Sequence, residues 1–560
     1  MKKREKISVF DTILRDGAQT PEIGLNLRDR LYIAKALANT GVDVIEIGFA
    51  ANDADYPYMR ELAKYIGNRR HSTNRKVPVV CSLARALKED VALAYKAIEP
   101  ADSDKRRIHI FIGTSEELMK YSHGKKEEEI LKMISDSVSY AKRLVGREGQ
   151  VQYSSEDALR TDIDFLVKTV QTAIDNGADI INVPDTTGFA IPDRYYKTIM
   201  KLKRRVKGID KVILSAHIHN DSGNAVATTL KGIEAGIRQI EGCALQLGER
   251  SGNVDWLTVV TDLRNLQDYY GVDVGHIEHE DLYNLAKLVS SITGQPIPLN
   301  HPVVGRAAFS ESAGIHVKGV LKNHKSYFVV DPASVGRKSE IVLGQTSGTN
   351  TVAYFLREHG YGEIKNDYTL KQVARMTSAV KKYSIKVRDS LSETEAMLFA
   401  EHYIRGKPLK KRVAMKDFQS TSSMNAKPWT RIVLKLDDKK RTGEGTGEGP
   451  IDAYMNAVKN ALGIDAGLHY WDEKAIYRGK GAPGYEMLNS MNFSEEERAI
   501  LGDNGESIGQ EAVAKSMIEL LYNNEIFHGR GYARDITRAT YNAIANALDA
   551  VYRLKMTSAL

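Results

Sequence analysis

The chain has little cysteine and no long apolar run, and each shortage excludes a class of protein. Its 560 residues include only two cysteines, Cys81 and Cys243, both within apolar segments. Two thiols cannot make a disulfide framework or a cysteine-based zinc site, and this usage is typical of a reducing compartment. No apolar run approaches about 18 residues, the length of a membrane span, and no apolar signal region follows the basic start. We therefore expect a cytoplasmic protein that does not engage a membrane.

The chain also lacks a large excess of charge of either sign. The 79 basic residues only slightly exceed the 72 acidic residues, which leaves a formal net charge of +7. This excess suits an anionic small substrate or cofactor, but it falls far short of a nucleic-acid-binding signature. The densest basic run, residues 405–412, is expected to be a solvated linker. A chain of this length predicts two to four domains.

Strand patterns alternate with helical patterns from residue 7 to about residue 266. The predicted strands are Ile7–Asp11, Val42–Phe49, Val77–Leu83, Arg107–Ile112, Val151–Ser154, Ile180–Val183, Val212–His219 and Gln239–Leu247. Eight strands, each followed by a helix, predict an α/β fold of the (β/α)8 TIM-barrel type, with an open, doubly wound sheet as the structural alternative. No Gly-x-Gly-x-x-Gly motif follows the first strand, so a dinucleotide-binding fold is not supported.

The remainder of the chain predicts further domains. We assign residues 1–275 to the barrel and residues 276–404 to a mainly helical subdomain with a loop-rich part. Residues 405–427, basic and then rich in serine and threonine, read as a linker. Residues 428–560 predict a separate α+β domain. Two Gly-rich turns there, at 442–450 and 529–531, each lead into a helix, which indicates an internal duplication.

A histidine pair marks the predicted site. His217 and His219 stand at i and i+2 at the end of an apolar strand, so both imidazoles can point to one side, as a divalent metal requires. In isolation this pair is at least as well explained by a solvated strand end. Asp16 follows the first strand and would supply a third ligand above the barrel, and Asn253 could add a carbonyl oxygen. Arg15 would place a fixed cation beside them.

Two long motifs then resemble a known family. Leu14–Gln19 and Leu214–Ala227 match the two signatures of the 2-isopropylmalate synthase and homocitrate synthase family, and the resemblance is strong over residues 1–355. It implies a barrel enzyme that condenses acetyl-CoA with a 2-oxo acid and uses a divalent metal, either Mg, Mn or Zn. It also implies that residues 1–275 are the catalytic barrel and that residues 276–404 complete the active site. It further implies a homodimer and a regulatory or dimerisation domain at 428–560, to which leucine could bind as an effector.

The resemblance assigns roles by position. Asp16, His217 and His219 correspond to metal ligands, with Asn253 nearby, and Arg15 corresponds to the residue that holds the substrate carbonyl. The remaining matches are Gln19, Ser154, Pro184 and Thr186, which line the 2-oxo acid site, and Glu156, His316 and Tyr327, which are the candidates for the base.

Several alternatives stay open on the sequence. The expected reaction joins acetyl-CoA to 2-oxoisovalerate to give 2-isopropylmalate and CoA, a step of leucine biosynthesis. Citramalate synthase, which uses pyruvate, and homocitrate synthase, which uses 2-oxoglutarate, are the rivals, and a metal-dependent acyl-CoA lyase is the rival from another class. The bulky residues 244–246 depart from the family pattern and leave specificity open, while Cys243 is expected to be a buried structural thiol. Residues 485–527 look longer than the family's regulatory domain requires.

Overall fold

The computed structural model describes residues 4–556 except 53, 75, 312–318, 320–322, 365–366, 388, 409, 477–512 and 534. The chain divides into two compact units. The first contains residues 1–310 and 323–340, and the second contains residues 311–322 and 341–560. Among the described residues no helix is long and apolar enough to cross a membrane.

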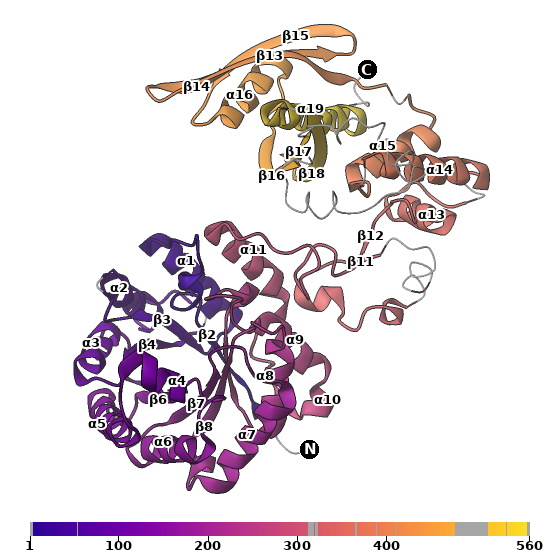
Figure 1. Cartoon of the computed structure of the whole chain (residues 1–560). Coiled ribbons are helices and arrows are strands. Elements are labelled where there is room, and N and C mark those ends of the chain that lie inside the picture. The colour runs from indigo at the N-terminus through magenta and orange to yellow at the C-terminus, as the bar shows by residue number, and fades with distance from the viewer. Residues whose placement is uncertain are drawn as a thin grey trace, which may run out of the picture. The chain divides into compact units, whose positions relative to one another are not determined.

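The first unit is built on a closed barrel of eight parallel strands in chain order (Figure 1). The strands are β2 (Ser8–Asp11), β3 (Val44–Phe49), β4 (Val79–Arg85), β5 (Arg106–Gly113), β6 (Gln150–Glu156), β7 (Ile180–Asp185), β8 (Ile213–Ile218) and β9 (Gln239–Gly242). The predicted barrel is therefore confirmed, and the open sheet is excluded.

Helices surround the barrel in the expected alternation. They are α1 (Leu27–Thr40), α2 (Tyr56–Ile66), α3 (Lys88–Ile98), α5 (Glu127–Val145), α6 (Ile163–Asp175), α7 (Pro192–Arg205), α8 (Ala225–Ala235) and α9 (Trp256–Asn265), with short α4 at Glu116–Leu118. Local sequence fixes several of their ends. The side chains of Asn26 and Asp29 form a capping box that begins α1, and Gly41, at φ +98°, ends it in a conformation that glycine adopts freely.

The eighth strand ends earlier than predicted. β9 stops at Gly242, where an added Cβ would lie 2.3 Å from the carbonyl oxygen of Val254. The chain then turns through a short 3₁₀ segment, Ala244–Gln246, in which Leu245 and Gln246 have φ angles of +63° and +59°. Residues 243–247, predicted as strand, are a loop at the mouth of the barrel, because the positive φ angles of Leu245 and Gln246 turn the chain out of the extended conformation.

The predicted subdomain 276–404 does not form one body. Residues 276–310 and 323–340, with α11 (Leu282–Thr293), belong to the barrel unit. That unit also holds α10 (Gln267–Tyr270) and the pair of β1 (Glu5–Lys6) and β10 (Val272–Asp273). Short strands β11 (Ser310–Glu311) and β12 (Glu340–Ile341) span two of the three points at which the chain passes from one unit to the other. Helices α13 (Thr349–Glu358), α14 (Leu370–Val387) and α15 (Glu393–Tyr403) surround a separate core in the second unit, which includes Val352, Phe355 and Val380.

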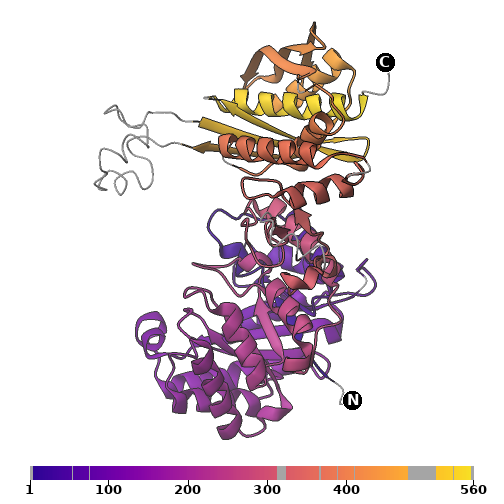
Figure 2. The ribbon, with the colours of Figure 1, turned by 90° about the vertical axis from the view of Figure 1, so that its right-hand side faces the viewer.

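The C-terminal part holds two successive βββα groups. The first comprises β13 (Val413–Ser423), β14 (Ala426–Leu436), β15 (Lys439–Thr446) and α16 (Pro450–Leu462). The second comprises β16 (Gly467–Ile476), β17 (Val513–Tyr522), β18 (Glu525–Ala533) and α19 (Ile536–Leu554). Figure 2 shows α19, in yellow, lying along the sheet of its own group. The two helices meet at Tyr454 and Tyr541, whose rings stack with centroids 4.0 Å apart.

The linker prediction for 405–427 is wrong, because residues 413–423 are a strand paired with β14. Its serine and threonine residues lie together at 420–423, mostly exposed at the end of the strand, and this composition resembles a linker in sequence. The basic residues before it are held by carboxylates: Arg405 contacts Glu401 at 2.9 Å, and Arg412 contacts Asp437 at 2.6 Å. The basic run is therefore part of the fold.

The two Gly-rich turns are also strands. Gly443 lies in β15 and Gly529 in β18, and each faces an alanine of its own group's helix. A Cβ at Gly443 would lie 2.2 Å from the carbonyl oxygen of Ala457, and one at Gly529 would lie 1.9 Å from that of Ala543. These glycines are required for close helix-to-strand packing rather than for a turn. Because both groups use this packing, the structure supports the predicted duplication. Of the unusual segment 485–527, residues 485–512 lie outside the described residues.

Candidate active site

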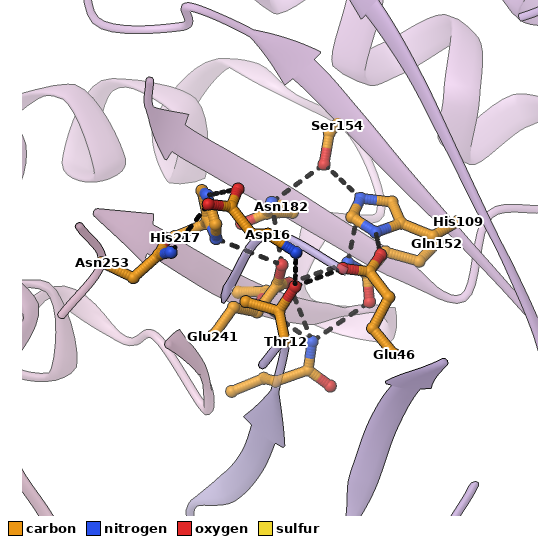
Figure 3. Close-up of polar contacts among 12 residues, drawn as sticks. Thr12, Asp16, Glu46, His109, Gln152, Ser154, Asn182, His217, Glu241 and Asn253 are labelled. Carbon is orange, nitrogen blue, oxygen red and sulfur yellow. Dashed lines mark hydrogen bonds and ion pairs between the residues drawn. The ribbon is translucent and has the colours of Figure 1, made fainter. Parts of the chain in front are cut away.

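Polar side chains converge at the carboxyl end of the barrel, where the predicted site residues come together (Figure 3). Asp16 follows β2, Glu46 lies in β3, His109 in β5, and Ser154 in β6, and His217 lies in β8. Alternate residues of a strand point to the same side, so these positions all face the barrel interior. This end of a TIM barrel is where enzymes of this fold carry their active sites.

Asp16, His217 and His219 form a buried three-residue cluster. The two Nε2 atoms lie 3.2 Å apart, and each lies 3.9 Å from Oδ2 of Asp16. Burial and the neighbouring imidazole lower the pKa of His217 to about 3, and burial also lowers the pKa of His219. Burial alone would raise the pKa of Asp16, but Arg15 and the histidines outweigh it and lower that pKa. Two neutral imidazoles and a carboxylate therefore aim lone pairs at one point.

This donor set fits a divalent cation. When both rings carry their proton on Nδ1, the two Nε2 atoms and Oδ2 of Asp16 all present lone pairs to one point, an arrangement that a cation would stabilise. The Nδ1 atoms of both histidines have no hydrogen-bond partner among the described residues. Two nitrogen donors and one carboxylate, with room left for substrate oxygens, are typical of Zn, Mn and Fe(II) sites, whereas Mg prefers oxygen ligands. Asp16, His217 and His219 would hold the ion.

Asn253 lies against this cluster and orients Asp16. Its Nδ2 donates to Oδ1 of Asp16 at 3.0 Å and to the carbonyl oxygen of Leu247 at 2.9 Å. Its Oδ1 is buried and has no partner among the described residues. The amide nitrogen, not the oxygen, therefore faces Asp16, and direct ligation by Asn253 stays a prediction. Gly248 makes this approach possible, because a Cβ there would lie 2.2 Å from the same Nδ2.

Arg15 is held as a fixed cation beside the metal-ligand cluster. Its Nη1 donates to Oδ2 of Asp16 at 2.7 Å, and its Nε donates to Oε2 of Glu46 at 2.6 Å. Burial would lower the pKa of Arg15, but Glu46 and Asp16 raise it, so the guanidinium stays charged. Burial likewise opposes ionisation of Glu46, yet Arg15 and His109 lower its pKa to about 2.

A continuous chain of hydrogen bonds supports the site from below. His109 contacts Oε1 of Glu46 at 2.9 Å through Nδ1 and Oγ of Ser154 at 2.6 Å through Nε2. Nδ2 of Asn182 donates to Ser154 at 2.8 Å and to Glu241 at 3.3 Å. Glu241 lies 4.0 Å from Nδ1 of His217, the position of an outer-shell carboxylate.

Sequence reasoning missed several of these supporting residues: Thr12, Gln152, Asn182, Gln239 and Glu241. The available signal was polar residues at alternate positions of apolar strands. Asn182 precedes Pro184 by two, and Gln239 precedes Glu241 by two, which places each pair on the interior side of a strand.

The other predicted residues are less uniform in position. Ser154 and Pro184 are buried within their strands, and Pro184 pairs with His217 across β7 and β8. The hydroxyl of Thr186, half-buried, accepts from the backbone N–H of Asp157 at 2.9 Å. Gln19 is exposed at the rim of the barrel.

The three candidate bases differ in their position and in their burial. Glu156 ends β6 half-buried, and burial together with Asp157 raises its pKa. Tyr327 is 43% exposed in the segment after the barrel. His316 lies outside the described residues.

One exposed arginine joins three loops above the site. Arg250, at φ +55°, donates through Nε to Oδ1 of Asp221 at 2.9 Å and through Nη2 to the carbonyl oxygen of Thr186 at 2.6 Å. These contacts tie together the loops after β7, β8 and β9. Cys243, near Asn253, is fully buried, and burial raises the pKa of its thiol, so it is the structural cysteine that we expected.

The barrel and its cluster define an enzyme of the HMGL-like class. The HMGL-like family model matches residues 6–289, the homocitrate synthase post-HMGL domain-like model matches residues 303–387, and the LeuA allosteric (dimerisation) domain model matches residues 367–492.

Full-length relatives narrow the class. The 2-isopropylmalate synthase of Aquifex aeolicus is 35% identical over 84% of this chain and 87% of its own length. The 2-isopropylmalate synthase of Pelotomaculum thermopropionicum is 33% identical over 97% of this chain and 98% of its own length. That of Pyrococcus furiosus is 34% identical over 98% of this chain and 99% of its own length. The chain belongs to the 2-isopropylmalate synthase family, an acyltransferase family, and the predicted resemblance is confirmed.

Proposed function

We propose that the chain condenses acetyl-CoA with 2-oxoisovalerate to give 2-isopropylmalate and CoA. The observation that carries this proposal is the cluster of Asp16, His217 and His219 beside the fixed cation Arg15, at the catalytic end of the barrel. A divalent cation, when bound there, would act as a Lewis acid toward the keto group of a chelating 2-oxo acid.

Arg15 is suited to stabilise the charge that develops in the reaction. The keto oxygen of the 2-oxo acid becomes an alkoxide as the new C–C bond forms, and a preoriented cation beside it lowers the barrier. Asp16 and Glu46 hold the guanidinium from two sides, so no side chain has to reorganise during the step. The hydroxyl of Ser154, which Nε2 of His109 holds at 2.6 Å, would be a further polar group for the substrate carboxylate.

Glu156 is the best-placed described candidate for the base. Its raised pKa makes its carboxylate a stronger base, and a positioned base typically contributes about 10²–10⁴ in rate. In the proposed step it takes a methyl proton from the acetyl thioester, and the resulting enolate carbon attacks the keto carbon. The alkoxide is then protonated, and water cleaves the thioester C–S bond with CoA thiol as leaving group. His316 and Tyr327 stay alternative bases.

The second unit is proposed to make a homodimer and to bind leucine as an effector. The paired βββα groups and the match to the LeuA allosteric (dimerisation) domain support this proposal. A lyase would not require such a domain. Added leucine is expected to inhibit thiol release. The leucine concentration that gives half-maximal inhibition should stay the same when the substrate concentration is lowered.

The substrate assignment is tested with purified full-length chain, Mn²⁺ or Mg²⁺, acetyl-CoA and a panel of 2-oxo acids, with free CoA thiol monitored. The proposal expects 2-oxoisovalerate to give the highest kcat/KM. A preference for pyruvate would indicate citramalate synthesis, and a preference for 2-oxoglutarate would indicate homocitrate synthesis. Absence of thiol release with every 2-oxo acid, together with cleavage of a 3-hydroxyacyl-CoA, would indicate the lyase reaction.

A further inference from the structure

A second cavity opens at the opposite, amino end of the barrel. It measures about 360 Å³, within the range of small-molecule sites, and the first residues of five strands contribute to its wall. These residues are Ser8 of β2, Val44 of β3, Val79 of β4, Gln150 of β6 and Ile213 of β8. The metal-ligand cluster lies at the other ends of the same strands, so this cavity is separate from the catalytic site.

The wall of this amino-end cavity carries an excess of positive charge. Lys76, Lys105 and Arg107 line it, and Asp43 is the one carboxylate among the described lining residues. Asp43 is already committed, because it bonds the ammonium of Lys6 and lies 2.7 Å from Nε2 of His276. The cavity therefore offers cations whose charge its own acidic group does not balance.

Arg107 is the deepest of these cations and is only 2% exposed. Its hydrogen bonds go to amide oxygens: Gln150 at 2.6 Å, Gln239 at 2.7 Å and Gln152 at 3.1 Å. None of its partners among the described residues is a carboxylate. A buried guanidinium is ordinarily paired with an anion, and neutral amides only partly replace one. Burial lowers the pKa of Arg107, as expected of a buried cation that lacks a carboxylate partner.

Lys105 stands two residues before Arg107 and is 21% exposed, with the adjacent Asp104 at 3.6 Å. Besides the charged groups and the polar Ser8 and Gln150, most of the wall is apolar and includes Val44, Val79 and Ile213. A ligand that fills this space must therefore combine one negative end with an apolar body. A carboxylate suits Lys105 and Arg107, since ammonium and guanidinium groups make strong charge-assisted bonds to it. A short branched hydrocarbon chain suits the valine-rich wall.

We propose that this amino-end cavity binds a small organic carboxylate with an apolar tail. The proposal does not depend on the reaction at the other end of the barrel. It assigns a ligand site to a face of the barrel where TIM-barrel enzymes do not carry their chemistry.

The test uses isothermal titration of the native full-length chain at constant ionic strength. The probes are 4-methylpentanoate, acetate, inorganic phosphate and the neutral 4-methylpentanamide. We expect saturable binding of 4-methylpentanoate, at least about tenfold tighter than acetate, because each buried methylene contributes roughly fourfold in affinity. Phosphate and the amide should each bind at least about tenfold more weakly than 4-methylpentanoate, since one lacks the tail and the other the charge.

Four variants locate the binding. Lys105→Gln and Lys76→Gln should each weaken it roughly tenfold, because each removes a charged partner. Lys132→Gln removes the same charge from the exposed side of α5 and should leave binding unchanged. Arg15→Gln alters the catalytic end only and should also leave it unchanged. Thiol release by Lys105→Gln should stay within about twofold of native, which separates this site from the proposed function.

Several results would overturn the proposal. They are unsaturable titration, equal affinity for acetate or phosphate, binding that persists unchanged in both Lys105→Gln and Lys76→Gln, and binding that is lost in Arg15→Gln.

Discussion

Replacement of Arg15 by glutamine removes the fixed cation beside the metal-ligand cluster. The guanidinium contributes two short contacts, at 2.7 Å to Asp16 and at 2.6 Å to Glu46. Loss of one preoriented group of this kind lowers kcat by about 10²–10³, which corresponds to about 2.7–4 kcal/mol. We therefore expect kcat to fall by at least about 10² while the KM for acetyl-CoA changes little.

The same change leaves Glu46 without its main partner. Glu46 is fully buried and would keep Thr12 and His109, so its pKa should rise from about 2. Loss of one partner of a buried ion pair costs about 3–5 kcal/mol, so circular dichroism must first show that the variant is folded. Arg15→Lys keeps the charge without the two-sided contact and should recover only part of the rate.

Thiol release from acetyl-CoA and 2-oxoisovalerate is the assay for both variants. Arg143→Gln, which removes an exposed arginine of α5, is the matched control and should behave as the native chain does. A folded Arg15→Gln with kcat within about threefold of native would refute the role given to Arg15.

Three further predictions follow from buried or crowded groups. Burial raises the pKa of Asp11 from 3.8 to about 7, so the folded state holds a proton that the unfolded state releases, and stability should fall as pH rises from about 4 to 7. Urea unfolding at pH 5 and 8 should show a smaller loss in Asp11→Asn; an equal loss would contradict this. Gly529→Ala should destabilise the second unit by about 1–3 kcal/mol in thermal unfolding, whereas Gly449→Ala, where nothing lies within 4 Å, should not. Arg250→Ala should raise the KM for the 2-oxo acid more than it lowers kcat, because the three loops that Arg250 joins are no longer connected. Arg250→Lys should partly restore the KM. Equal changes in KM and kcat in the folded alanine and lysine variants would argue for a purely structural contact.

The barrel could be predicted because strand and helix periods alternate cleanly over its length. Prediction failed where a local pattern has two physical meanings. Glycines at 443 and 529 read as turns, but they lie in strands that must accommodate a helix backbone. The serine- and threonine-rich run at 420–423 read as part of a linker, but it is the mostly exposed end of a strand.

In the site, too, some residues could be predicted from the sequence and others could not. Asp16, His217 and His219 could be predicted because their residue types and their spacing point to a metal, and the structure brings them together. For Glu241 and Asn182 the sequence offers only the weaker signal of a polar residue inside an apolar strand, since their importance depends on barrel closure, which places β9 and β7 beside the histidine strand. A single carboxylate inside an apolar strand carries no such information until its neighbours are known.

The most direct measurement compares thiol release by the native chain and by His219→Ala, with acetyl-CoA, 2-oxoisovalerate and added Mn²⁺. The proposed function predicts robust release by the native chain, its loss on chelation and return on addition of the ion, and no measurable release by a folded His219→Ala. Near-native release by that variant would contradict the assignment of Asp16, His217 and His219 as the catalytic metal centre.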